Sequence, residues 1–228
     1  MTSIATGVFA AIRLLPRDPR SAPDAVRFVK SFRPSYSPLA AEVPWMTYKA
    51  ARWLDRHLRK DMSVFEYGSG GSTVFFANRV HRLVSVEHDA AWHTQVSEVL
   101  EKRGVTSCEY LLREPQPAPP DRPSEHRWDL YTSTDRDFAG FVFDGYVKTI
   151  DAFPDGSFDL VVVDGRARSS CVHHGLPKVR PGGMLLLDDS DRPDYADAVD
   201  WIGPRPRTDF RGISPAAGTL TQGSVWRV

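Results

Sequence analysis

The feature that most constrains the fold is a regular alternation of short apolar strands and helices that begins at Val64. Residues 158–164 are almost continuously apolar, as expected of a strand that is covered on both faces. Strands that alternate with helices predict an open, doubly wound α/β sheet that is mostly parallel. The tail, around residues 208–213 and 218–228, predicts an antiparallel pair. Ligands of such sheets bind at the carboxyl ends of the strands.

The chain divides into two parts of opposite charge. Its 228 residues suit one domain with additions, and its formal net charge is zero. Residues 1–63 nevertheless carry 11 basic and 5 acidic side chains, a net charge of +6. We predict a basic N-terminal arm that ends in an amphipathic helix, residues 1–63, followed by a ligand-binding domain, residues 64–228. The arm could fold over the site, contact a neighbouring subunit in a homodimer, or attract an acidic substrate.

Composition excludes several classes of protein. A net charge of zero removes the general electrostatic reason to expect a nucleic-acid binder. No stretch approaches the roughly 20 apolar residues of a membrane helix, and no basic segment precedes an apolar one as in a signal peptide. Cys108 and Cys171 lie in no metal-ligand spacing. We therefore expect a cytoplasmic protein that binds neither nucleic acid nor membrane.

Prolines interrupt the chain in two places. Residues 16–44 contain six prolines, which predict an extended arm with at most one short helix, near residues 24–32. Residues 113–138 form an irregular insertion that is typical of a lid, a binding loop or a disordered segment. We expect the insertion to supply substrate contacts. Its candidate side chains are the aromatic Trp128, Tyr131 and Phe138 and the basic Arg122, Arg127 and Arg136.

The strongest local signal is a glycine-rich turn between a strand and a helix, residues 66–73 (EYGSGGST). Its glycines allow a ligand to approach the backbone, and the helix N-terminus offers free N–H groups. Glu87 ends the next strand, 19 residues after Gly68, where a carboxylate can accept both hydroxyls of a ribose. Thr73 replaces the third glycine of a dinucleotide fingerprint. A nucleoside without a pyrophosphate therefore fits better, and a plain strand-to-helix turn is the alternative.

At these positions the sequence resembles the class I S-adenosylmethionine-dependent methyltransferases. The matching segments are residues 65–70 (FEYGSG), 86–89 (VEHD), 158–165 (FDLVVVDG) and 179–184 (VRPGGM). The resemblance covers roughly residue 45 to the C-terminus. It implies a seven-stranded Rossmann-like sheet with an antiparallel C-terminal strand, and S-adenosyl-L-methionine as cofactor.

The resemblance also implies roles for single residues. Glu66 would lie near the methionine ammonium, and Glu87 would bind the ribose. Trp92 either covers the adenine or packs its helix on the sheet. The residues expected to bind the cofactor are Glu66, Tyr67, Gly68, Ser69, Gly70, Ser72, Thr73, Glu87, His88, Trp92, Asp144, Tyr146 and Asp164.

Residues 163–165 (VDG) and 187–189 (LDD) resemble the O-methyltransferase branch that includes catechol-type and macrocin-type enzymes. In that branch, carboxylates at the ends of the fourth and fifth strands hold a divalent cation beside the substrate hydroxyl. The resemblance implies that Asp164, Asp188 and Asp189 bind Mg²⁺, which would lower the pKa of a hydroxyl and orient its oxygen. The alternative is that Asp188, Asp189 and Asp191 cap the following helix or line a solvated strand end.

Other side chains near the expected site could act without a metal. His173 and His174, in the helix after the fourth strand, join Asp164 as candidate catalytic residues, because a neutral imidazole can take a hydroxyl proton. Arg166 and Arg168 favour a substrate that bears a carboxylate or phosphate.

We therefore predict a methyltransferase that acts on a small-molecule acceptor, on oxygen in preference to nitrogen. Two alternatives stay open at this point: an NAD(P)-dependent Rossmann oxidoreductase, and a non-catalytic module that binds S-adenosylmethionine.

Overall fold

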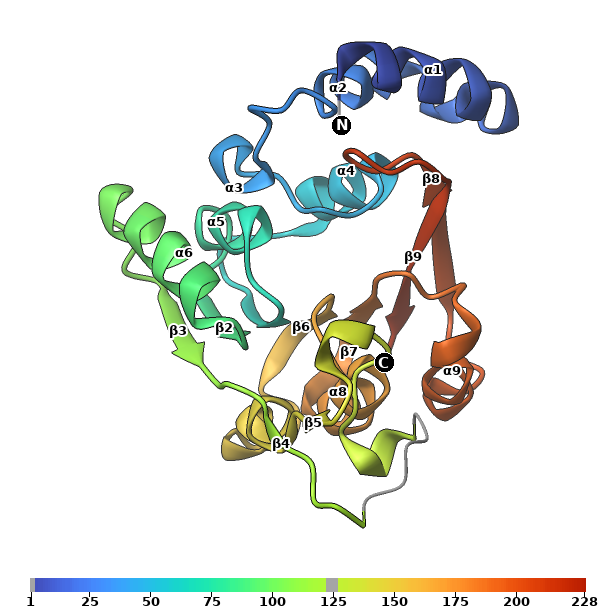
Figure 1. The fold of residues 1–228 in the computed structure, drawn as a ribbon. Helices are drawn as coiled ribbons and strands as arrows, with labels where there is room; N and C mark the ends of the chain where they lie inside the picture. The colour runs from blue at the N-terminus through green and yellow to red at the C-terminus, as the bar shows by residue number, and fades with distance from the viewer. Residues whose placement is uncertain (1–2, 122–126) are drawn as a thin grey trace.

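One seven-stranded sheet organises the chain (Figure 1). The computed structural model describes residues 3–121 and 127–228. The strand order is β3-β2-β1-β6-β7-β9-β8, in which β9 runs antiparallel to both β7 and β8 and the other pairs are parallel. The strands are β1 Ser63–Tyr67, β2 Arg82–Glu87, β3 Cys108–Leu112, β6 Phe158–Val163, β7 Val179–Leu187, β8 Arg207–Gly212 and β9 Thr221–Arg227. The predicted α/β fold is confirmed.

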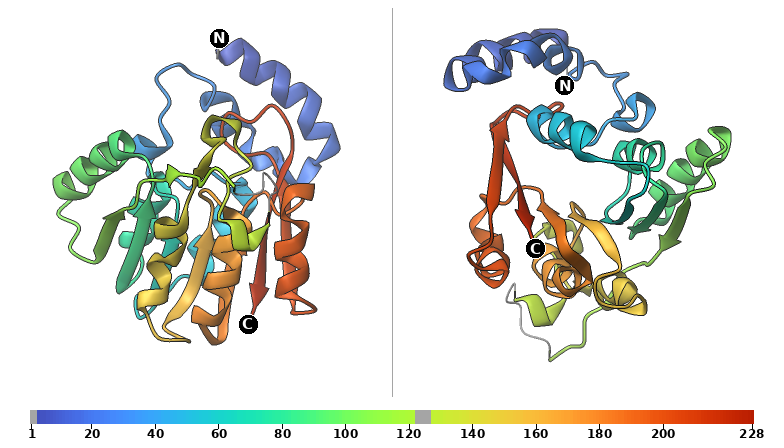
Figure 2. Two further views of the ribbon diagram at one scale, coloured as in Figure 1. Left: turned by 60° about the horizontal axis from the view of Figure 1, so that its bottom comes forward. Right: turned by 180° about the vertical axis from the view of Figure 1, so that it is seen from behind.

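Helices cover both faces of the sheet, as the two views of Figure 2 show. One face packs against α4 (Tyr48–His57) and α5 (Gly71–Ala77), with α6 (Ala90–Lys102) beside α5. The other face packs against α7 (Asp144–Val147), α8 (Arg168–Gly175) and α9 (Ala196–Ile202). No helix in the described part of the chain is long and apolar enough to cross a membrane.

Because helices pack on both faces of the sheet, β6 carries a run of apolar side chains on both of its faces. Side chains alternate between the two faces of a strand. Val161 and Val163 therefore join the core beneath α7, α8 and α9, whereas Leu160 and Val162 join the core beneath α4 and α5. All four side chains are fully buried. The run consequently places the end of β6 at the centre of the molecule.

The arm contains α1 (Ile4–Leu14), α2 (Ala25–Lys30) and α3 (Pro38–Ala41), with 3₁₀ turns between α1 and α2. The short helix expected near residues 24–32 is present as α2. The rest of residues 16–44 holds 3₁₀ turns and a second helix, α3, so the prediction of an otherwise extended segment is wrong. Pro19 and Pro38 begin helical turns, where the missing proline N–H is not needed. Prolines therefore mark the starts of short helices here and do not prevent them.

The helices of the arm are tied to one another, and the arm packs on α5 of the sheet domain. Lys49 pairs with Asp18 at 2.7 Å, and Arg52 pairs with Asp24, so α4 holds the preceding turns. A Cβ added at Gly71 would lie 2.2 Å from the Pro38 carbonyl oxygen and 2.5 Å from that of Val43. The backbone of α3 and the loop after it therefore lies directly against the first turn of α5.

The insertion is anchored at its base. The strands β4 (Gln116–Pro117) and β5 (Phe141–Val142) pair antiparallel, and the described residues between them include 3₁₀ turns at Trp128–Leu130 and Arg136–Phe138. The candidate Arg122 lies outside the described residues.

We predict that Gly71→Ala lowers the free energy of unfolding by about 1–3 kcal/mol, because the new methyl group overlaps the arm backbone. Gly145→Ala is the matched control: a Cβ there meets no atom within 4 Å, so its change should stay within about 0.5 kcal/mol. Urea titration of both variants measures the difference. Equal losses would contradict the docking of the arm on α5.

Candidate active site

The site begins where the turns after β1 and β6 meet. Gly68 has φ of 88°, and a Cβ on it would lie 2.7 Å from the Gly165 Cα. A Cβ on Gly165 would in turn lie 1.9 Å from the Tyr146 hydroxyl oxygen. Both positions therefore require glycine, and the two backbones touch without intervening side chains. This contact brings the carboxyl ends of β1 and β6 together.

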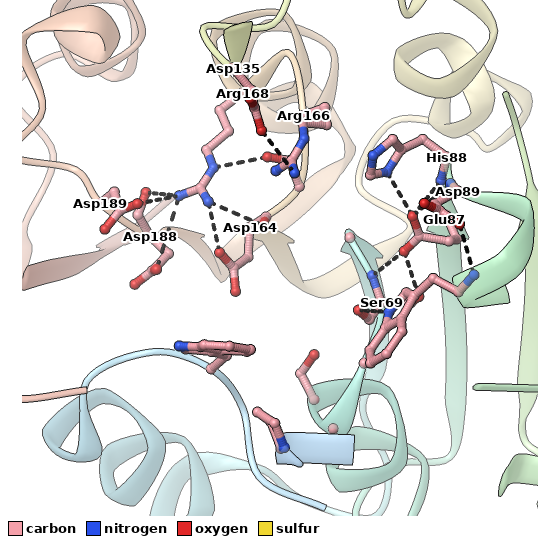
Figure 3. Close-up of a pocket in the computed structure, with 18 of the residues that line it drawn as sticks. Ser69, Glu87, His88, Asp89, Asp135, Asp164, Arg166, Arg168, Asp188 and Asp189 are labelled. Atoms are coloured by element: carbon pink, nitrogen blue, oxygen red, sulfur yellow. Dashed lines mark hydrogen bonds and ion pairs between the residues drawn. The ribbon is translucent and has the colours of Figure 1, made fainter. Parts of the chain in front are cut away.

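A cavity of about 720 Å³ opens at these strand ends (Figure 3). Its size is typical of small-molecule sites. The expected cofactor residues that line it are Gly68, Ser69, Gly70, Ser72, Glu87, His88, Trp92 and Asp164. Arg166, Arg168, Asp188 and Asp189 line it as well. The structure thus brings most of the sequence-selected residues to one place.

Glu87 is the polar centre of one side of the cavity. Its Oε2 accepts hydrogen bonds from the Ser69 N–H at 3.1 Å and the Ser69 hydroxyl at 2.6 Å. Its Oε1 accepts the backbone N–H groups of His88 and Asp89, and the His88 Nδ1 lies 2.7 Å away. Burial alone would raise the pKa of Glu87, but these donors lower it to about 2. Glu87 is therefore a fixed carboxylate.

Trp92 and Gly70 shape the wall beside Glu87. The Trp92 indole N–H donates to the Ser69 carbonyl at 3.0 Å, and a Cβ on Gly70 would lie 3.6 Å from the Trp92 ring. The flat ring therefore lies against the glycine turn.

Glu66, Tyr67 and Thr73 lie behind the cavity wall rather than on it. The Glu66 Oε2 accepts hydrogen bonds from the hydroxyls of Thr73 and Ser85, both at 2.7 Å, while its Oε1 is buried without a hydrogen-bond partner. Burial raises the pKa of Glu66 to about 7. Tyr67 donates to the Val147 carbonyl, so it ties β1 to α7. Asp144 and Tyr146 are also absent from the cavity lining.

The opposite side of the cavity holds one arginine among three aspartates (Figure 3). The Arg168 Nη2 lies 3.0 Å from the Asp164 Oδ1, and its Nη1 lies 3.5 Å from Asp189 and 4.0 Å from Asp188. Burial raises the pKa of Asp164 to about 6, and burial together with Asp164 raises that of Asp188. Burial alone would lower the pKa of Arg168, but the surrounding carboxylates raise it by more. The net shift is upward, so the guanidinium stays charged.

This arrangement does not fit the expected Mg²⁺ site. Mg²⁺ needs oxygen ligands at about 2.0–2.1 Å in octahedral geometry. The three carboxylates instead surround a guanidinium. Among the described residues, no group of three or more histidine, cysteine or acidic side chains is arranged to hold a metal ion.

A second cavity of about 340 Å³ adjoins the first and shares Asp135, Gly165, Arg166 and Arg168 with it. Its wall includes four arginines, Arg136, Arg166, Arg168 and Arg192. Arg166 pairs with Asp135 at 3.1 Å and lies over the Phe138 ring. The insertion therefore forms part of the wall of both cavities.

Four other candidates, Trp128, Tyr131, His173 and His174, lie away from both cavities, as does Arg127, which pairs with Asp129. The His173 ring is stacked between Trp128 and Trp201, with ring centroids 4.3 and 4.4 Å away. Burial lowers the pKa of His173. His174 has its Nδ1 2.9 Å from Asp151 and its Nε2 3.4 Å from the Tyr131 hydroxyl. The structure uses these four side chains to hold the insertion on α8.

A sequence profile described as a methyltransferase domain matches residues 65–190, more than half of the chain. The chain belongs to this methyltransferase family. The match spans the glycine turn, Glu87 and the strand ends of β6 and β7, so the predicted membership among class I S-adenosylmethionine-dependent methyltransferases is confirmed. The family match also decides against the alternative of an NAD(P)-dependent oxidoreductase. No curated protein sequence matches the chain.

Solved structures share the fold of this methyltransferase. A protein from Klebsiella pneumoniae proposed to be an O-methyltransferase is 16% identical, with a TM-score of 0.56 over 92% of this chain and 99% of that chain. An rRNA methylase from Streptococcus thermophilus is 12% identical, with a TM-score of 0.52 over 79% and 96%. TomG, an O-methyltransferase of tomaymycin synthesis from Streptomyces achromogenes solved with S-adenosylmethionine, is 16% identical, with a TM-score of 0.50 over 75% and 74%.

The methyltransferase cavity fits the cofactor that its family uses. The glycine turn offers an approachable backbone and the Trp92 ring a flat surface, and the Glu87 carboxylate lies on the same wall. The unpartnered Glu66 Oε1 is an acceptor beneath that turn.

Sequence reasoning missed the part of the wall that the arm and the tail supply. Pro38 and Trp45 of the arm line the large cavity, as do Ser214, Ala217 and Thr221 between β8 and β9. The sequence signal that could have found this wall is the aromatic residue Trp45, three residues before α4. Asp135 and Asp137 of the insertion also line the cavity, although the sequence prediction for the insertion names only aromatic and basic side chains.

We predict that Glu87 makes the stability of this methyltransferase depend on acid pH. Because the folded-state pKa of about 2 lies below the ordinary 4.5, the ionised carboxylate stabilises the fold above about pH 4.5. This contribution, about 3 kcal/mol, is lost as the pH falls from 4.5 through 2. Denaturant titrations of wild type and Glu87→Gln should give unfolding free energies that differ most at pH 7 and converge on acidification. Parallel curves would refute the assignment.

Proposed function

We propose that this methyltransferase transfers the methyl group of S-adenosylmethionine to a hydroxyl oxygen of a small-molecule acceptor that carries a carboxylate or phosphate. The observation that carries the proposal is the pair of adjoining cavities. The large cavity is lined by the cofactor motifs, and the small one by four arginines. They meet at Gly165, Arg166 and Arg168, next to Asp164.

The small cavity supports an anionic acceptor. Arg136 forms no ion pair with another described residue, whereas Arg166 and Arg192 each face one or more aspartates. A guanidinium without a carboxylate partner is suited to a carboxylate or phosphate of a ligand. The cavity volume of about 340 Å³ and the net charge of zero favour a small molecule over a nucleic acid.

Asp164 is the proposed general base. Its carboxylate ends β6, lines the large cavity and is held by the Arg168 Nη2 at 3.0 Å. A carboxyl group whose pKa is raised to about 6 by burial is ionised at pH 7 and still accepts a proton readily. An oxygen acceptor is favoured because a neutral hydroxyl must lose its proton to become a strong nucleophile.

The remaining residues position the reactants. When bound, S-adenosylmethionine supplies a methyl group on a sulfonium, which an in-line oxygen can attack. Glu87 and Trp92 hold the nucleoside end, and the touching turns of Gly68 and Gly165 fix the distance between that end and Asp164. No step is assigned to Mg²⁺, because Arg168 lies among its expected ligands.

We predict that Glu87→Ala weakens the binding of S-adenosylhomocysteine by about 10- to 100-fold, because the ribose hydroxyls lose a charged acceptor. Calorimetric titration of wild type and variant measures the change. Glu98→Ala, an exposed glutamate of α6 that faces Lys102, is the matched control and should bind like wild type. Undiminished affinity in Glu87→Ala would remove the ribose assignment.

We predict that Asp164→Asn lowers kcat by about 10²- to 10⁴-fold while the affinity for S-adenosylhomocysteine stays within about threefold. The assay follows transfer of a labelled methyl group to phenols and sugars offered with and without a carboxylate or phosphate. Acceptors with the acidic group should have the lower KM. Asp155→Asn, which removes an exposed partner of Lys178, should keep the wild-type kcat. Transfer to RNA alone would overturn the acceptor class.

A further inference from the structure

The Arg168 guanidinium is fixed by the backbone. Its Nε donates to the Gly165 carbonyl at 3.1 Å, its Nη1 to the Asp188 carbonyl at 2.6 Å, and its Nη2 to the Asp164 carbonyl at 3.2 Å. The side chain is 9% exposed. Moving it would leave three carbonyl groups at the ends of β6 and β7 without these donors. The guanidinium is therefore a permanent part of the site.

The turn after β6 directs the Arg168 side chain toward the ends of β6 and β7. Ala167 has a left-handed φ of 47°, which turns the chain sharply after β6 so that Arg168 begins α8. Arg168 lies four residues after Asp164, and its side chain reaches back across the strand ends. Figure 3 shows the guanidinium between Asp188 and Asp189 on one side and Asp164 on the other.

The carboxylates converge on the guanidinium. Its Nη2 binds the Asp164 Oδ1 at 3.0 Å, and its Nη1 faces Asp189 at 3.5 Å and Asp188 at 4.0 Å. These are the three aspartates that the O-methyltransferase resemblance selects as ligands of a divalent cation. One delocalised positive charge thus occupies the space between them.

We propose that Arg168 is a built-in cation that replaces the divalent metal ion, so that this site binds its acceptor and transfers the methyl group without a metal. A divalent cation that entered the cluster would meet the fixed guanidinium charge at close range and would find the Asp164 Oδ1 already engaged. The catalytic part of this proposal rests on the proposed methyl transfer, whereas the exclusion of metal does not.

Arg168 acts here as a fixed charge and not as an anchor for substrate. Its Nε and both terminal nitrogens already donate hydrogen bonds to backbone carbonyl groups, and Nη2 also donates to the Asp164 carboxylate. Arg136, at the edge of the small cavity, is better suited to contact an acidic group of the acceptor.

The test measures metal binding directly. Mn²⁺, which has a paramagnetic signal that falls on binding, is titrated into the full-length wild type and Arg168→Met. We expect wild type to bind more weakly than about 10⁻² M and the variant with a Kd of about 10⁻⁴ M, the weak end of carboxylate-built sites. Arg192→Met is the matched control, because Arg192 faces Asp189 at 3.8 Å from a side chain that is 43% exposed. It should resemble wild type, as should Arg168→Lys, which keeps the charge.

Two results would overturn the proposal. One is Mn²⁺ binding by wild type below about 1 mM that Asp164→Asn abolishes. The other is an Arg168→Met protein that still binds S-adenosylhomocysteine, and is therefore folded, but gains no affinity for Mn²⁺. If Arg168→Met does not fold, the wild-type titration decides alone. Because the readout is metal binding, its result is independent of whether the acceptor is correctly assigned.

Discussion

The site depends on contact between two backbones. The turns after β1 and β6 meet at Gly68 and Gly165 with no space for a Cβ atom, and Tyr146 closes the space beneath Gly165. A side chain at either glycine would force the turns apart and separate the nucleoside side of the cavity from the carboxylates at the ends of β6 and β7. The apolar core of β6, covered on both faces, holds the second turn in place. Packing thus determines the distance over which a methyl group can be transferred.

The central part of this arrangement could be predicted because it is local. Apolar runs, glycine turns and the carboxylates at strand ends are read from neighbouring residues, and parallel topology brings the strand ends to one edge. Glu87 and Gly68 lie in different elements, yet that rule alone places them together. The pairing of Asp164 with Arg168 does not follow from their spacing of four, because Asp164 precedes α8 and the left-handed turn at Ala167 brings the two side chains together.

The rest depends on contacts between distant segments. The prolines of residues 16–44 predict an extended segment because proline usually interrupts a helix, whereas the partners that hold the turns of this segment, such as Lys49 for Asp18, lie in α4. His173 was selected for its chemistry, but its orientation is determined by Trp128 and Trp201 from two other segments. No pattern within the helix specifies which ring a side chain will meet.

Pro38, Trp45 and the loop between β8 and β9 close the cavity from outside the span that defines the family, residues 65–190. The glycine turn and the carboxylates at the strand ends therefore lie within the domain or at its edge, while part of the wall of the large cavity belongs to flanking sequence. Two chains can share every motif of the domain and still present different walls to a substrate. Exchanging the arm and the tail loop would therefore replace this part of the cavity wall and leave the glycine turn and the ends of β1 and β6 unchanged.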